Sequence, residues 1–167
     1  MANGLTPNGL LAYNGTKYLV RVDSFKRGEM SLRLEVKDSV QSYKNLPRRV
    51  TYNMGNWEEF NHIMQKNCSF VDVVSNRGAE EFLKGTGLAK PFVRNNEEVV
   101  RSNDNGDWYP VYQFDEQMLW RLDPAGYGNY NRSYDAAVKR LGQRTFQYVF
   151  NKGPYVGDDN RADDLQL

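Results

Sequence analysis

Alternating apolar and polar positions in the first part of the chain predict β-strands. Over residues 17–23, Tyr18, Val20 and Val22 fall on one face, and polar side chains occupy most of the other. Residues 30–36 repeat this period of two. Each segment is therefore predicted to bury one face and leave the other in water.

A tight turn is predicted between the first two strands. Asn14-Gly15 lies between apolar segments at 10–13 and 17–23, and this pair favours a type I′ hairpin turn because both positions need positive φ. Residues 49–54 predict a fourth strand, so the region forms an antiparallel meander. Residues 1–9 have no such pattern and are expected to be an arm or loop.

Helical spacing and capping residues predict three or four short helices. They are a helix from Asn56, one over 77–84 that stops at Gly85, one from the Asp115 cap to Leu122, and one from Ser133 to Gly142. Between the last two, residues 123–133 are rich in Gly, Asn and Tyr and predict a loop.

The remaining apolar segments predict further strands. Residues 70–74 read as a buried strand, 97–102 and 108–114 as a hairpin, and 144–150 as a last strand. The fold class is therefore α+β: an antiparallel sheet or meander with three to four short helices in one compact domain.

One domain is predicted over residues 1–157, with a soft division near 90–96, and an acidic tail follows at 158–167. No stretch is apolar enough to span a membrane and the N-terminus does not resemble a signal peptide, so a cytoplasmic protein is expected.

The scarcity of reactive side chains argues against catalysis. The chain has one cysteine, Cys68, and one histidine, His62, so neither a disulfide framework nor a multidentate zinc site is available. A Cys68–His62 pair is conceivable, but a surface imidazole and a small buried thiol are the simpler interpretation. No metal or cofactor is expected, and the chain is predicted not to be an enzyme.

Charge is sorted along the chain although the net charge is only +1. Basic residues predominate over 1–50 and 121–157, and acidic ones over 51–120 and 158–167. Such blocks can steer a charged partner, or they can fold so that opposite blocks neutralise each other.

The predicted loop at 123–133 is the preferred contact region, because Tyr, Arg, Gly and Asn are common in adaptable binding surfaces. The predicted partner-binding residues are Arg121, Tyr127, Tyr130, Arg132, Lys139, Arg140 and Arg144. Two alternatives stay open: the tyrosines can pack the domain, and Lys139 and Arg140 can serve a helix C-terminus. A second basic set surrounds the first hairpin: Arg21, Lys26, Arg27 and Arg33.

Phe146, Tyr148 and Phe150 alternate along the last predicted strand and could stack nucleobases, as in a single-stranded nucleic-acid-binding module. Three alternating aromatic side chains are also typical of a core. The sequence leaves both interpretations open.

Residues 15–88 contain the hairpin around Tyr18, the segment Val50-Thr51-Tyr52-Asn53, and an Asn76-x-Gly78 start followed by Phe82-Leu83 and Gly87-Leu88. In these features the chain resembles a family of small accessory proteins of bacterial mobile elements and phages. The resemblance implies a mobile-element origin and a role in binding.

The predicted function is thus a non-catalytic protein that occupies a host protein or nucleoprotein, such as an anti-CRISPR or anti-restriction inhibitor. A small virion or assembly component with extended arms at 1–9 and 151–167 is the alternative.

Overall fold

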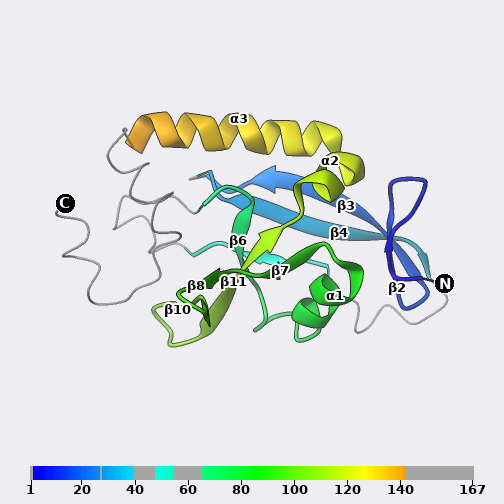
Figure 1. Cartoon of the computed structure of the whole chain (residues 1–167), viewed down its shortest axis with the longest axis horizontal. Coiled ribbons are helices and arrows are strands. Elements are labelled where there is room, and N and C mark those ends of the chain that lie inside the picture. Colours follow the sequence, from blue (N-terminus) through cyan, green and yellow to red (C-terminus); the bar gives the residue numbers. More distant parts are fainter. Residues whose placement is uncertain (1, 27, 40–47, 55–64, 142–167) are drawn as a thin grey trace.

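The computed structural model describes residues 2–26, 28–39, 48–54 and 65–141. Within these residues it has helices and antiparallel sheets, which confirms the predicted α+β class (Figure 1). The helix predicted from Asn56, the strand at 144–150 and the acidic tail lie outside the described residues, as do His62 and Gly142.

The first sheet has the order β1-β2-β3-β4. Its strands are Gly4–Leu5, Leu11–Tyr13, Thr16–Ser24 and Met30–Ser39. The predicted turn is confirmed, because Asn14 and Gly15 have φ values of 49° and 83°.

Within residues 1–9, which were predicted to be an arm or loop, Gly4–Leu5 forms a strand, whereas residues 6–9 do not. Gly4–Leu5 pairs with β2, and the amide N–H of Asn14 donates to Asn3 Oδ1 at 2.8 Å. Backbone pairing with the hairpin therefore holds residues whose side chains carry no strand pattern.

A second sheet has the order β10-β11-β6-β5, with β7 also paired to β11. Its strands are Thr51–Tyr52 (β5), Cys68–Val71 (β6), Ala89–Pro91 (β7), Val100–Ser102 (β10) and Trp108–Phe114 (β11). A small hairpin, β8 (Val93–Arg94) with β9 (Glu97–Glu98), lies beside it. Residues 90–96, where a soft division was predicted, thus belong to this sheet and its hairpin.

Residues 48–50 connect the two sheets. The amide N–H of Leu34 donates to the carbonyl of Arg48 at 2.6 Å, and that of Val50 donates to the carbonyl of Leu32 at 3.1 Å. Arg33 and Arg49 face each other between these two bonds. The strand order therefore continues from β4 through this segment to β6.

Three helices occur in the described residues: α1 (Ala79–Thr86), α2 (Glu116–Leu122) and α3 (Pro124–Leu141). The predicted cap of α2 is confirmed, since Asp115 Oδ1 accepts the amide N–H of Met118 at 2.9 Å. Helix α1 ends at Gly87, in the left-handed conformation at φ 76°, rather than at the expected Gly85.

The loop predicted over 123–133 and the cap predicted at Ser133 are both wrong, because α3 is continuous through them. Its Gly and Asn residues have low helix propensity, which is why their composition indicated a loop. Tertiary packing overrides that preference: α3 lies along β3 (Figure 1) and buries Tyr127, Tyr130, Tyr134 and Ala137.

The main core lies between α3, α1 and the inner face of the first sheet. Tyr18, Val20 and Val22 are buried there as their alternation predicted. The ring of Phe82 from α1 packs edge-on against that of Tyr18, with centroids 5.3 Å apart. A smaller second cluster, which includes Phe70 and Tyr109, lies on one face of the second sheet.

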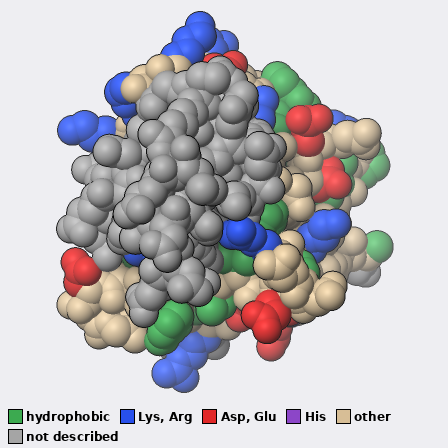
Figure 2. All heavy atoms as spheres, turned by 60° about the vertical axis from the view of Figure 1, so that its left-hand side comes forward, with side chains coloured by type: hydrophobic (Ala, Val, Ile, Leu, Met, Phe, Trp, Pro, Cys, Tyr) green, Lys and Arg blue, Asp and Glu red, His purple; other side chains and the backbone are tan. Residues whose placement is uncertain are grey.

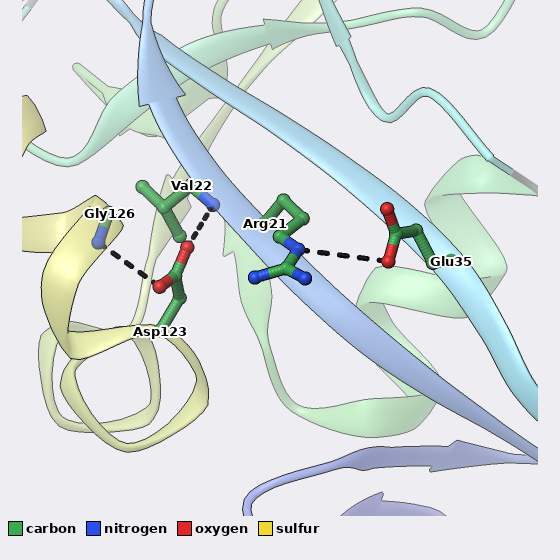
Figure 3. Close-up of polar contacts among 5 residues, drawn as sticks. All are labelled: Arg21, Val22, Glu35, Asp123 and Gly126. Carbon is green, nitrogen blue, oxygen red and sulfur yellow. Dashed lines mark hydrogen bonds and ion pairs between the residues drawn. The ribbon is translucent and has the colours of Figure 1, made fainter.

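Asp123 fixes the start of α3 against β3 (Figure 3). Its Oδ1 accepts the amide N–H of Gly126 at 3.1 Å, and its Oδ2 accepts that of Val22 at 2.9 Å. Because β2 pairs with β3 only as far as Tyr18, the Val22 amide belongs to an open sheet edge. One carboxylate therefore caps a helix and covers part of that edge.

Gly126 is required by this close approach. A Cβ atom added at Gly126 would lie 2.2 Å from the Val22 carbonyl oxygen and 2.2 Å from Asp123 Oδ2. Gly128, one half-turn further along α3, has room, because an added Cβ would meet only Arg132 Nη1 at 3.7 Å. Position 128 of α3 therefore has room for a side chain, whereas position 126 does not.

We expect Gly126→Ala to lower the free energy of unfolding by about 2 to 3 kcal/mol, because helix and strand must separate to admit the methyl group. Gly128→Ala is the matched control and should raise it by up to about 1 kcal/mol through helix propensity. Urea unfolding of both variants measures the difference. Equal effects of the two substitutions would contradict a tight contact at Gly126.

Candidate functional site

Tyr127 and Tyr130, predicted to contact a partner, are fully buried on the inner face of α3. Their ring centroids are 5.8 Å apart, with an interplanar angle of 24°. Buried side chains cannot form an exposed contact surface, so the structure places both tyrosines in the core. Both tyrosines pack the domain, which is the alternative that the sequence left open.

Their hydroxyl groups converge on Asn67, which the sequence analysis did not single out. Tyr127 Oη donates to Asn67 Oδ1 at 2.5 Å, and Tyr130 Oη accepts the Asn67 amide N–H at 2.8 Å. The Asn67 carbonyl accepts the amide N–H of Phe114 at 2.7 Å. Asn67 also has φ 66°, a conformation that Asn tolerates better than most residues. It therefore ties α3 to the turn before β6 and to the end of β11.

The sequence did contain a signal for α3. Asp123-Pro124 is a favourable pair for the cap and first position of a helix. From there Tyr127, Tyr130 and Tyr134 recur at helical spacing.

The basic side chains of the same region remain exposed. Arg121 lies in the last turn of α2, and Arg132, Lys139 and Arg140 lie on α3 away from the sheet. Arg132 donates a hydrogen bond to Asn129 Oδ1 on the same helix. Lys139 and Arg140 occupy the last turn of α3, where cations favour the helix dipole. Arg144 lies outside the described residues.

The second basic set is brought together more closely. Arg21 of β3 lies directly opposite Arg33 of β4, and Arg33 lies directly opposite Arg49. All three side chains are exposed. Lys26 is exposed just after β3, and Arg27 lies outside the described residues. We call Arg21, Arg33 and Arg49 the arginine row.

The pairing of Arg33 with Arg49 is the closest kind that an antiparallel ladder offers. The backbone bonds on either side, Leu34 to Arg48 and Val50 to Leu32, make it a non-hydrogen-bonded pair. In such pairs the Cα atoms are about 4.5 Å apart and the side chains stand close together. Like charges at this spacing repel each other.

Little in the described structure offsets this repulsion. Glu35 Oε2 lies 3.7 Å from Arg21 Nε (Figure 3), and both side chains are about half exposed. An exposed pair of this kind contributes about 0 to 1 kcal/mol. Neither Arg33 nor Arg49 forms an ion pair with a carboxylate of the described residues. The arginine row is therefore a concentration of positive charge at the surface.

Arg49 was missed as a site residue because its partner strand cannot be read from the sequence. The sequence predicts only that Arg49 begins a strand over residues 49–54. Which residue of β4 it faces depends on the register between β4 and a segment that follows residues 40–47. Register of this kind is set by tertiary packing.

Charges that are sorted in the sequence are mixed on one side of the molecule. Figure 2 shows acidic and basic side chains interspersed around the residues that the structure does not describe. On that side, the charge blocks do not form a field of a single sign.

The possible nucleophile is inaccessible. Cys68 is fully buried, and burial raises the pKa of its thiol well above the ordinary value. Over the residues that the structure covers, no three His, Cys, Asp or Glu side chains lie close enough to hold a metal ion. These features give no support to nucleophilic or metal-assisted chemistry at the described positions.

A cleft of about 610 Å³ opens between the end of α1, β7 and the start of α2. Lys84 and Lys90 line it together with Asp115 and Glu116, so its charges are mixed. Asp115 already caps α2, and Asn67, which also lines the cleft, is bonded to Tyr127. These two polar groups therefore serve the fold.

Comparisons with protein-family models, with curated proteins and with solved structures found no match to this chain. None of the helices within the described ranges is both long and apolar enough to cross a membrane. The resemblance to mobile-element accessory proteins stays a prediction.

We expect Tyr127→Phe and Tyr130→Phe each to lower the free energy of unfolding by about 1 to 2 kcal/mol, because each leaves a polar group of Asn67 without its partner. Arg132→Gln, on the exposed side of the same helix, should change it by less than about 0.5 kcal/mol. Chemical denaturation measures all three variants. Tyrosine variants as stable as the wild type would contradict a stabilising role for the hydrogen bonds to Asn67.

Burial also predicts a loss of stability at alkaline pH. It raises the pKa of Tyr18 and of Tyr127 to about 12 in the folded chain, from an ordinary value of 10.0. Between these values only the unfolded chain releases the phenolic protons, so the free energy of unfolding falls as pH rises from 10 to 12. Denaturant midpoints across this range measure the slope. Tyr127→Phe removes one titrating group and should make the slope shallower.

Proposed function

We propose that this chain is a non-catalytic binding protein that occupies the nucleic-acid surface of a host nucleoprotein, and that the arginine row is its contact. The observation that carries the proposal is the direct alignment of Arg21, Arg33 and Arg49 across neighbouring strands. Each position is exposed, and the arrangement raises the energy of the free protein.

Arginine is the side chain best suited to phosphate. Its planar guanidinium presents a fork of N–H donors that can bond two oxygens of one phosphate. An anion between two guanidinium groups also removes their mutual repulsion. Binding would therefore be driven by the same feature that is unfavourable in the unbound chain.

The composition of the surrounding face favours contact with a duplex backbone over stacking on single strands. None of the side chains that flank the row on β3 and β4 is aromatic; they are Leu19, Asp23, Ser31 and Glu35. Single-stranded nucleic acids are held largely by stacking on aromatic rings. Tyr127 and Tyr130 are buried, so they offer no such platform.

An origin in a phage or mobile element, and an anti-CRISPR or anti-restriction role, are part of this proposal and rest on the sequence resemblance. The alternative role as a virion component relied on two extended arms. Because Gly4–Leu5 is paired in the first sheet, that alternative now depends on residues 151–167, outside the described residues.

The test measures binding of a labelled short DNA duplex to the triple variant Arg21→Gln, Arg33→Gln, Arg49→Gln. Its matched control is Arg132→Gln, Lys139→Gln, Arg140→Gln, which removes the same charge from α3. We expect the first variant to lose roughly tenfold or more in affinity, and the salt slope to fall by roughly 2 to 3. The α3 variant should lose much less.

Glu35→Gln tests whether a negative charge beside the arginine row weakens the binding of the duplex. It frees Arg21 from its ion pair, so duplex affinity should increase. The arginine-row variant should be at least as stable as the wild type, because it removes the like-charge repulsion. The other variants should keep the stability of the wild type within about 0.5 kcal/mol, because the substituted side chains are exposed. Equal losses in both triple variants would show attraction to net charge alone, and tighter binding to the single strand would favour the stacking alternative. Binding only to an acidic peptide would indicate a protein partner.

A further inference from the structure

Three large apolar side chains are exposed on the strands from β8 to β11. Val93 is 53% exposed, Val100 42% and Trp108 60%. A buried tryptophan contributes strongly to stability, and one this exposed contributes much less. The fold therefore gives no reason for Trp108 at this position.

Strand pairing places these side chains on one face. Val93 lies opposite Glu98, Val100 lies opposite Pro110, and Trp108 lies opposite Ser102. Val99 separates β9 from β10, but positions 98, 100 and 102 share one side, because the buried positions 99 and 101 alternate with them. Pro110 is buried on this face, next to Val100.

The opposite face of the same strands is core. Phe92, Val99 and Tyr109 are buried in the second hydrophobic cluster. The alternation of buried and exposed positions over 98–102 follows the same division. The exposed apolar group is thus a continuous face that the described chain leaves uncovered.

The exposed acidic side chain of Glu98 borders this face, directly opposite Val93. Tyr112 lies two positions beyond Pro110 on β11, and its hydroxyl donates to Glu80 Oε1 at 2.6 Å. Burial, and then the negative charges of Glu80 and Glu98, raise the pKa of Tyr112 far above its ordinary value. The Glu80 carboxylate is therefore already bonded within the fold. We call Val93, Val100 and Trp108, with Glu98 opposite Val93, the Trp108 surface.

We propose that the Trp108 surface docks a segment of a partner protein that carries Lys or Arg beside an apolar side chain. Charge complementarity selects this occupant, because the exposed carboxylate of Glu98 at the border attracts a cation. The indole face can hold that cation as well, and an exposed tryptophan next to aliphatic side chains is typical of binding hot spots. This site is independent of the arginine row, which has the opposite charge.

The probe is a random-peptide display library selected against the whole chain. Enriched sequences should combine Lys or Arg with an apolar residue, and the synthesised peptides should lose roughly tenfold or more in affinity for Trp108→Ala. Trp120→Ala is the matched control, because Trp120 is 45% exposed but lies on α2. It should bind the peptides as wild type does.

Two further variants sharpen the test. The Glu98→Lys variant should bind the basic peptides more weakly than the wild type does. The arginine-row triple variant should bind them with the affinity of the wild type. Enriched peptides without positive charge, equal affinity for Trp108→Ala, or no enrichment at all would overturn the proposal. Self-association of the wild type that Trp108→Ala abolishes would also overturn it, because the occupant would then be a second copy of this chain.

Discussion

The rest of the structure depends on the direct packing of α3 against β3. Asp123 bonds the amides of Val22 and Gly126, so the helix begins in direct contact with the sheet. A helix with several Gly and Asn residues is marginal in water and needs such an anchor. Only glycine at position 126 allows α3 to approach β3 this closely, since even one methyl group there would overlap the strand.

From that anchor the helix places its tyrosines over the turn at Asn67. Tyr127 and Tyr130 combine large apolar rings with hydroxyl groups that satisfy a backbone amide and a side-chain amide. The same residue accepts a bond from Phe114 in β11. Helix α3, the turn before β6 and the second sheet are thus connected through one asparagine, and the aromatic richness of this region is used for the core.

Because the tyrosines are buried in the core, a contact surface has to consist of side chains that face outward. The outer side of β3, β4 and the segment at Arg49 carries guanidinium groups in register. The strands from β8 to β11 carry an apolar face beside the carboxylate of Glu98. The arginine row and the Trp108 surface differ in charge. The first would suit the nucleic acid of a nucleoprotein, and the second would suit its protein component.

The sequence by itself determined the α+β class, the Asn14-Gly15 turn, the buried face of β3 and the Asp115 cap, because each depends on neighbours within a few residues. Only the tertiary structure decided that residues 124–133 are helical, since burial against the sheet outweighs their weak propensity. It alone placed Arg49 beside Arg33. Register between strands distant in sequence is set by packing, and no local pattern encodes it.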